Sequence, residues 1–215
     1  MEESEWKCFH QFTVRLGWNT LTGVGPANDC EHHHVLRLNI CRSRTDRIIV
    51  RFLRWLPSPL QCAIRKFWPG YFLPGNIVLK KLKPQWDVEF DNEIAMYQRL
   101  RPLQGRVIPV YYGEARCEGV RAIILQDIHG VPPFGQQKPY ITADEFRRKL
   151  EVAYQELCTF GVITDDDKLA NTILVDDKVM LVDLEMACDA DVNNRDSWRG
   201  FTIQGLVRQY KEFLS

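Results

Sequence analysis

The order in which strand-like and helix-like patterns follow one another constrains the fold of this chain most. Short runs of alternating apolar residues, typical of strands, recur before residue 126, and one helical pattern lies among them at 87–103. A polar connector rich in proline and glycine then leads to Thr142, which is suited to cap an amphipathic helix ending near Gly161. With a last helix expected near 201–214, the sequence predicts an α+β protein, β-rich first and helical afterwards.

Residues 1–70 are the hardest part of the chain to assign. Strand-like runs occur at 11–16, 34–40 and 46–53, and the prolines within 55–75 predict that no long element forms there. Seven basic residues and one acid lie between 42 and 66. Because the run 46–53 is strand-like and prolines lie nearby, a half-exposed protein surface explains this charge better than contact with anionic lipid or nucleic acid.

The composition of the chain excludes few functions. Its 28 Lys and Arg residues balance 28 Asp and Glu, so no net charge favours nucleic acid or a membrane as a partner. The seven cysteines are scattered without a C-x-x-C pair, which is typical of reduced thiols. The first residues lack the basic start and apolar run of a secretory signal. We expect a cytoplasmic protein that binds neither nucleic acid nor a membrane.

Cys30 and the three histidines His32, His33 and His34 form one candidate metal site. Thiolate and imidazole groups are zinc ligands. Adjacent histidines rarely converge on one ion, however, so an ordinary loop is the preferred interpretation.

The stretch 161–185 holds the residues that could carry chemistry. Asp166, Lys168 and Asn171 lie in a loop after the predicted helix, and a hairpin follows whose second strand ends at Asp183. Phosphoryl transfer from ATP needs a carboxylate to orient the attacking hydroxyl, an amide and a carboxylate for magnesium, and a cation near the phosphates. Those residue types occur here in that order, although a solvated acidic turn is the simpler alternative for TDDDK.

These residues resemble the protein-kinase-like superfamily. Asp166 and Asn171 keep the five-residue step of the catalytic loop H-R-D-x-x-x-x-N, and Lys168 lies where many such kinases have lysine. The D-L-E sequence from Asp183 to Glu185 is similar to the ending found in choline-kinase and aminoglycoside-phosphotransferase relatives. Sequence segments within 75–187 also resemble short kinase-like proteins of filamentous fungi.

The resemblance implies a two-lobed fold of the protein-kinase type. Its β-rich first lobe would span residues 1–126, a linker 127–141, and a minimal helical second lobe 142–215. It also implies ATP and Mg²⁺ as cofactors. The phosphate acceptor would be a protein hydroxyl or a small alcohol, between which the sequence does not choose.

The resemblance further implies a role for each residue of the second-lobe site. Asp166 would orient the acceptor hydroxyl with Lys168 beside it, Asn171 and Asp183 would bind magnesium, and Glu185 would be an additional carboxylate near the metal.

The nucleotide-binding residues implied by the resemblance lie earlier in the chain. Lys80 in IVLKK matches the strand lysine that binds phosphate oxygens, with Lys81 as the fallback. Glu93 is the expected helix partner of that lysine, and Glu89 on the same helical face is second.

The predicted linker would supply the adenine contact. Backbone groups of Gln126 and Ile128 would hydrogen-bond adenine, with an ordinary loop after a strand as the alternative.

Departures from the family pattern leave a second function open. Thr164 stands two residues before Asp166, where the family has histidine, and no G-x-G-x-x-G precedes Lys80. Only 30 residues follow Glu185, so the second lobe is short. The alternatives to an active phosphotransferase are a pseudokinase-type binding or scaffolding module and a truncated kinase-like fragment.

Overall fold

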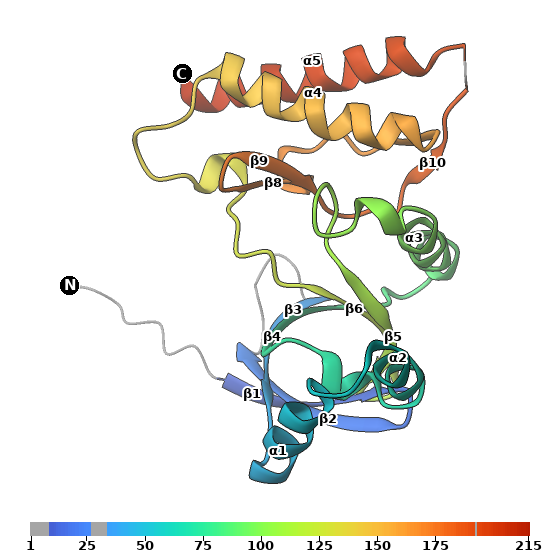
Figure 1. The fold of residues 1–215 in the computed structure, drawn as a ribbon. Helices are drawn as coiled ribbons and strands as arrows, with labels where there is room; N and C mark the ends of the chain where they lie inside the picture. Colours follow the sequence, from blue (N-terminus) through green and yellow to red (C-terminus); the bar gives the residue numbers. More distant parts are fainter. Residues whose placement is uncertain (1–8, 27–33, 192) are drawn as a thin grey trace, which may run out of the picture. The chain divides into compact units, whose positions relative to one another are not determined.

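The computed structural model describes residues 9–26, 34–191 and 193–215. Two compact units make up the chain (Figure 1). The first consists of residues 1–86 and 111–127, and the second of residues 87–110 and 128–215. The candidate zinc site at Cys30 and its neighbouring histidines lies, apart from His34, outside the described residues.

The first unit is built on a closed antiparallel β-barrel with the strand order β1-β2-β3-β4-β6-β5. Pairing of Val14 with Cys117 and of Arg15 with Arg116 closes the sheet between its first and fifth strands. The strands are β1 (Phe9–Leu16), β2 (Asn19–Pro26), β3 (Val35–Cys41), β4 (Asn76–Lys81), β5 (Tyr111–Cys117) and β6 (Val120–Gln126).

Alternation of apolar residues along each strand fills the interior of the barrel. Val14, Ile77 and Ile124 are fully buried, as expected when every second side chain of a strand faces inward. At Gly25 in β2, an added Cβ would lie 2.2 Å from the carbonyl oxygen of Arg37, so only glycine permits this close approach to β3.

The predicted fold class, a two-lobed fold of the protein-kinase type, is wrong. The β-rich part is a closed six-stranded antiparallel barrel, and the chain does not show a clear two-lobed kinase fold. The physical reason is the pairing of β1 with β5, which joins residues about a hundred positions apart. Short-range alternation predicts strands but not which strands pair, so the closure was not visible in the sequence.

Two helices occupy part of the region that was hardest to assign: α1 (Arg44–Leu53) and α2 (Ser58–Phe67). Ser43 caps α1, because its Oγ accepts from the Asp46 amide at 3.1 Å while Asp46 Oδ2 accepts from the Ser43 amide at 3.0 Å. Pro59 lies in the first turn of α2, where a missing N–H costs nothing. The strand predicted at 46–53 is therefore wrong, and a helix of 10 residues lies within 55–75, where no long element was predicted.

The second unit consists mainly of three helices and two small β-ladders. The final helices pack together, with the rings of Phe146 and Tyr210 4.6 Å apart. No helix in the described ranges is long and apolar enough to cross a membrane. The main elements are α3 (Asp87–Arg99), α4 (Ala143–Thr159), β7 (Val162–Thr164), β8 (Thr172–Val175), β9 (Lys178–Leu181), β10 (Ala187–Asp189) and α5 (Arg195–Leu214), and short 3₁₀ turns (η) lie between them.

Local signals predicted the second unit well. The helix expected from residue 87 is confirmed, and Thr142 caps α4 by accepting from the Glu145 amide at 3.1 Å. The hairpin β8–β9 turns at Asp176 and Asp177 as predicted. The last helix begins at Arg195, earlier than expected.

Candidate functional site

The loop after β7 holds three polar side chains in mutual contact. The carboxylate of Asp166 accepts hydrogen bonds from Lys168 Nζ at 3.0 Å and from Asn171 Nδ2 at 2.9 Å. Asp166 is half-buried, and Lys168 is exposed. Two donors, one of them charged, fix the orientation of the Asp166 carboxylate.

Main-chain hydrogen bonds join this loop to the segment that follows β9. The Val182 amide donates to the Asn171 carbonyl at 2.9 Å, and the Asp165 amide donates to the Met186 carbonyl at 3.3 Å. From the other side, Gln209 of α5 donates its Nε2 hydrogen to the Asp167 carbonyl at 2.8 Å. The loop is therefore positioned by the segment after β9 and by α5.

Three carboxylates gather beside the same segment. One oxygen each from Glu93, Asp183 and Glu185 lies within 4.8 Å of the others. Glu93, on α3, is fully buried, and its Oε1 lies 3.4 Å from the Leu184 amide. Asn92 holds the segment against α3 by donating from Nδ2 to the Glu185 carbonyl at 3.0 Å and to the Ala187 carbonyl at 2.8 Å.

The backbone of Asp183 adopts a conformation that costs energy. Its φ is +64°, in the left-handed region that residues other than glycine rarely occupy. Such residues concentrate at functional sites, where the surrounding structure holds them in place. Asp183, which has this unusual backbone conformation, also supplies one of the three gathered carboxylates.

The donor set of these groups suits a hard divalent cation. Carboxylate oxygens, here those of Glu93, Asp183 and Glu185, are the ligand type that Mg²⁺ prefers. Carboxylates this close to one another repel, and a cation between them would offset that repulsion. The residues present therefore fit magnesium.

The charges of this region also shift the pKa values of neighbouring side chains. Burial raises the pKa of Tyr97 well above its usual value, and the charges of Glu93 and Asp183 raise it further. The hydrogen bond to Asp166 and the charge of that carboxylate raise the pKa of Lys168. Lys168 therefore remains a cation at neutral pH.

The predicted residues of the second unit lie in two groups, whose segments are linked by the hydrogen bond from the Val182 amide to the Asn171 carbonyl. Asp166, Lys168 and Asn171 are in contact, and Asp183 lies with Glu93 and Glu185. Glu89, the second choice on α3, is half-buried and is not one of the gathered carboxylates.

The predicted nucleotide-binding residues of the first unit lie on its barrel. Lys80 is buried on β4, in register with Val35 and Ile123. Lys81, the fallback, forms an ion pair with Glu118 at 3.0 Å within the first unit.

The two residues of the predicted adenine contact fall in different units. Gln126 ends β6 in the first unit, whereas Ile128 begins the C-terminal segment of the second.

Two features of the site were missed from the sequence. Glu93 was expected only as the partner of a lysine, yet its carboxylate gathers with two others about 90 residues away. Asn92 was not considered at all, although an amide next to Glu93 in F-D-N-E was the available signal.

Comparison with known proteins gives a structural neighbour but no family. No protein-family profile and no curated protein matches the sequence. A solved structure described as a divergent kinase lacking the glycine-rich loop, which regulates membrane ultrastructure of the Toxoplasma parasitophorous vacuole, is 16% identical with a TM-score of 0.49. The similarity covers 80% of this chain and 62% of that chain, so the chain spans less than two thirds of that protein. It assigns no role to any residue here.

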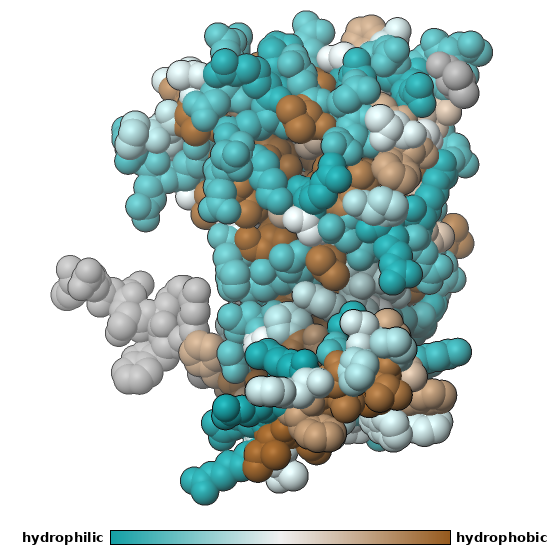
Figure 2. All heavy atoms as spheres, in the orientation of Figure 1, coloured by the Kyte–Doolittle hydropathy of each residue, from teal (hydrophilic) through white to brown (hydrophobic). Residues whose placement is uncertain are grey.

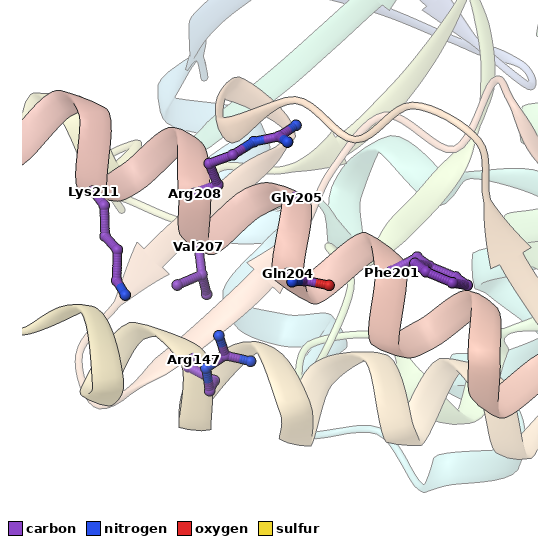
Figure 3. A pocket seen from close by; sticks show the side chains of 7 residues that line it. All are labelled: Arg147, Phe201, Gln204, Gly205, Val207, Arg208 and Lys211. Atoms are coloured by element: carbon purple, nitrogen blue, oxygen red, sulfur yellow. The ribbon is translucent and has the colours of Figure 1, made fainter.

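A separate hollow of about 550 Å³ lies between α4 and α5. Figure 3 shows Lys211 and Val207 projecting from α5 toward α4, with Arg147 on α4 opposite them. None of its lining residues belongs to the gathered carboxylates or to the Asp166 loop. They are Arg147, Phe201, Gln204, Gly205, Val207, Arg208 and Lys211.

Replacing Asp167 by Asn is expected to stabilise the protein slightly at neutral pH. Partial burial is the largest influence on the pKa of Asp167 and raises it; a hydrogen bond with Thr202 opposes this, and the charges of Asp165 and Asp166 raise the pKa further. A raised folded-state pKa means that stability falls as the pH rises from about 3.8 through that pKa. The asparagine removes this loss of stability, which is roughly half a kcal/mol or less because solvent screens a side chain that is only partly buried.

Urea unfolding of the wild type and Asp167→Asn at pH 7 and at decreasing pH checks this expectation. The advantage of the variant should shrink as the pH approaches 3.8. Asp177→Asn, an exposed change in the β8–β9 turn, is the control. If Asp167→Asn were less stable than the wild type at pH 7, the ionised Asp167 carboxylate would not destabilise the fold as expected.

Proposed function

We propose that the second unit carries an ATP- and Mg²⁺-dependent phosphotransferase site that acts on a hydroxyl acceptor. One observation carries the proposal: the Val182 amide donates to the Asn171 carbonyl at 2.9 Å. This bond links the Asp166 loop to the segment bearing Asp183 and Glu185. A carboxylate suited to an acceptor hydroxyl and carboxylates suited to a metal are thereby joined in one unit.

Asp166 is the group proposed to orient the acceptor. Its hydrogen bonds with Lys168 and Asn171 leave lone pairs of the carboxylate for the hydroxyl of an acceptor. The cationic Lys168 beside it would stabilise negative charge on a transferring phosphoryl group. The acceptor is a protein hydroxyl or a small alcohol.

Glu93, Asn171, Asp183 and Glu185 are the proposed ligands of magnesium. When bound, the ion would neutralise phosphate charge and orient the phosphates. The contribution of the chain is to hold these groups: Asn92 fixes the Glu185 backbone, and α3 supplies Glu93 from a buried position.

Nucleotide recognition is proposed to involve residues on the barrel as well. Lys80 on β4 is the candidate for the phosphate oxygens, and Lys81, which forms an ion pair with Glu118, is the fallback. The backbone of Gln126, at the end of β6, is the candidate for an adenine contact.

A second function is a pseudokinase-type module that binds nucleotide with weak or no transfer. The environment of Thr164 favours it: this residue is buried, pairs with Ala187 between β7 and β10, and hydrogen-bonds Tyr154. Thr164 thus supports the fold, and it replaces the scaffold histidine that the resemblance would lead one to expect before Asp166.

Thermal unfolding with ATP and Mg²⁺, compared with ATP plus chelator, tests both functions. Nucleotide at about 100 times its dissociation constant should add about 2.7 kcal/mol, which raises the midpoint by roughly 5–10 °C for a chain of this size. Release of phosphate or its transfer to hydroxyl acceptors is measured in parallel. A magnesium-dependent shift without transfer would select the binding module, and no shift under any condition would overturn both proposals.

A further inference from the structure

Helix α1 exposes a stripe of large apolar side chains. Ile48, Phe52 and Trp55, just beyond its end, are 69%, 64% and 83% exposed. Their spacing of four and three residues places them on one helical face. Leu53, on a different face, is buried. The strand predicted at 46–53 does not reach Trp55, and the helical conformation brings Trp55 onto the same face as Ile48 and Phe52.

Four arginines follow a second face of α1: Arg44, Arg47, Arg51 and Arg54. At about 100° per residue, this face lies roughly a quarter turn from the apolar stripe. All four are exposed, and no described residue forms a hydrogen bond or ion pair with their side chains. Asp46, the single acid between 42 and 66, is engaged in the cap with Ser43. The exposed side of α1 is therefore apolar along one edge and cationic along the next.

Helix α2 extends this surface. Gln61 fixes α2 to the end of α1 by donating from Nε2 to the Leu56 carbonyl at 2.8 Å. Leu60 and Phe67, on one face of α2, are 52% and 45% exposed. Figure 2 shows hydrophobic residues gathered over α1 and α2. Arg65 and Lys66 add two further cations.

An aromatic cluster lies at the end of α2. The ring of Trp18, in the β1–β2 turn, lies 5.4 Å from Phe67 and 5.9 Å from Trp68. Trp18 and Trp68 are both exposed. Tryptophan is the side chain most enriched where an apolar phase meets water.

An exposed surface of this size and composition favours one kind of partner. Soluble proteins rarely leave contiguous apolar patches uncovered. Nucleic acid would engage the arginines and stack on tryptophan, but the side chains of Ile48 and Leu60 would gain nothing from it. A membrane offers acyl chains and anionic headgroups at neighbouring depths, which matches the adjacent apolar and cationic faces of α1.

We propose that α1 and α2 form a docking surface for anionic phospholipid membranes. Ile48, Phe52 and Trp55 enter the boundary between headgroups and acyl chains, and the four arginines of α1 contact the anionic headgroups. The helices lie along the membrane surface rather than across it. This inference is independent of the phosphotransferase proposal, because every residue in it belongs to the first unit.

Flotation of the full chain with phosphatidylcholine vesicles, with and without phosphatidylserine, tests the proposal. Binding is expected only where phosphatidylserine is present, and should weaken as salt is raised. Phe52→Ser and Trp55→Ser should each weaken it about tenfold, from the lost transfer of an aromatic side chain. Arg47→Gln and Arg51→Gln should each weaken it about fivefold.

Matched controls come from α5 in the second unit. Phe201→Ser removes a 71% exposed aromatic side chain, and Arg208→Gln removes an exposed cation; neither should change vesicle binding. Lipids brominated on the acyl chain should quench tryptophan fluorescence, less in Trp55→Phe than in the wild type. Equal binding to vesicles without phosphatidylserine, insensitivity to the α1 variants, or binding to duplex DNA but to no vesicle would overturn the proposal.

Discussion

Asp183→Asn is expected to abolish the stabilisation of the protein by ATP and Mg²⁺. The variant removes one charge from the three carboxylates gathered within 4.8 Å and leaves a side chain of nearly the same size. Because a neutral amide is a weaker ligand for Mg²⁺ than a carboxylate, the about 2.7 kcal/mol expected at saturating nucleotide should disappear. Phosphate transfer should be lost with it. Thermal unfolding with and without chelator measures the first effect, and a transfer assay measures the second.

Asp166→Asn separates binding from chemistry at the same site. Asp166 hydrogen-bonds Lys168 and Asn171 but is not among the gathered carboxylates. Its variant should keep the magnesium-dependent shift and lose transfer by roughly 10²- to 10⁴-fold, the usual contribution of a positioned acid or base.

The control for both variants is Asp177→Asn, at the opposite end of the β8–β9 hairpin. It changes an exposed carboxylate in the same unit and should leave the shift and any transfer unchanged. A full shift in Asp183→Asn, equal in size with and without chelator, would contradict the metal-binding role of this carboxylate.

The parts of the site that follow from sequence are those whose residues are close together in the chain. Asp166, Lys168 and Asn171 lie within six positions, and a 3₁₀ turn at 169–171 is enough to bring the amide back to the carboxylate. Asp183 follows a hairpin whose two-residue turn is itself a local signal. Spacing therefore keeps these residues close together, and the resemblance to kinases assigned them to one site.

The parts that could not be predicted depend on distant pairings. Val14 meets Cys117 to close the barrel, and Glu93 meets Asp183 across 90 residues. Nothing in the local pattern of either segment specifies its partner.

The assignment of α1 failed for a different reason. A run such as IIVRFL suits a strand as well as a helix, and the capping box of Ser43 and Asp46 decided for the helix. That cap was readable as S-x-x-D, and it carried more information than the β-branched residues beside it.

The last helix, α5, holds the loop of the site in place. The sequence analysis gave no role to the residues of α5 that do so. Tyr210 is fully buried, and its hydroxyl donates to the Ile141 carbonyl and accepts from Gln136 Nε2, both at 2.9 Å. Its ring packs on Phe146 of α4, and its neighbour Gln209 donates to the Asp167 carbonyl. One turn of α5 thus fixes α4, the connector before it and the site loop.

Tyr210→Ala is therefore expected to destabilise the protein by about 3–5 kcal/mol, the usual cost of removing a buried aromatic ring. Since a domain of ordinary stability has about 5–15 kcal/mol in total, this loss should lower the unfolding midpoint sharply and weaken any ATP-dependent shift with it. Tyr210→Phe keeps the ring and loses only the two hydrogen bonds, so it should cost about 1–2 kcal/mol. Phe213→Ala, three residues away at a 36% exposed position, should cost less than about 1 kcal/mol. Urea unfolding of the wild type and the three variants measures these differences in stability. If Tyr210→Ala were as stable as Tyr210→Phe, the ring of Tyr210 would not hold α5 against α4.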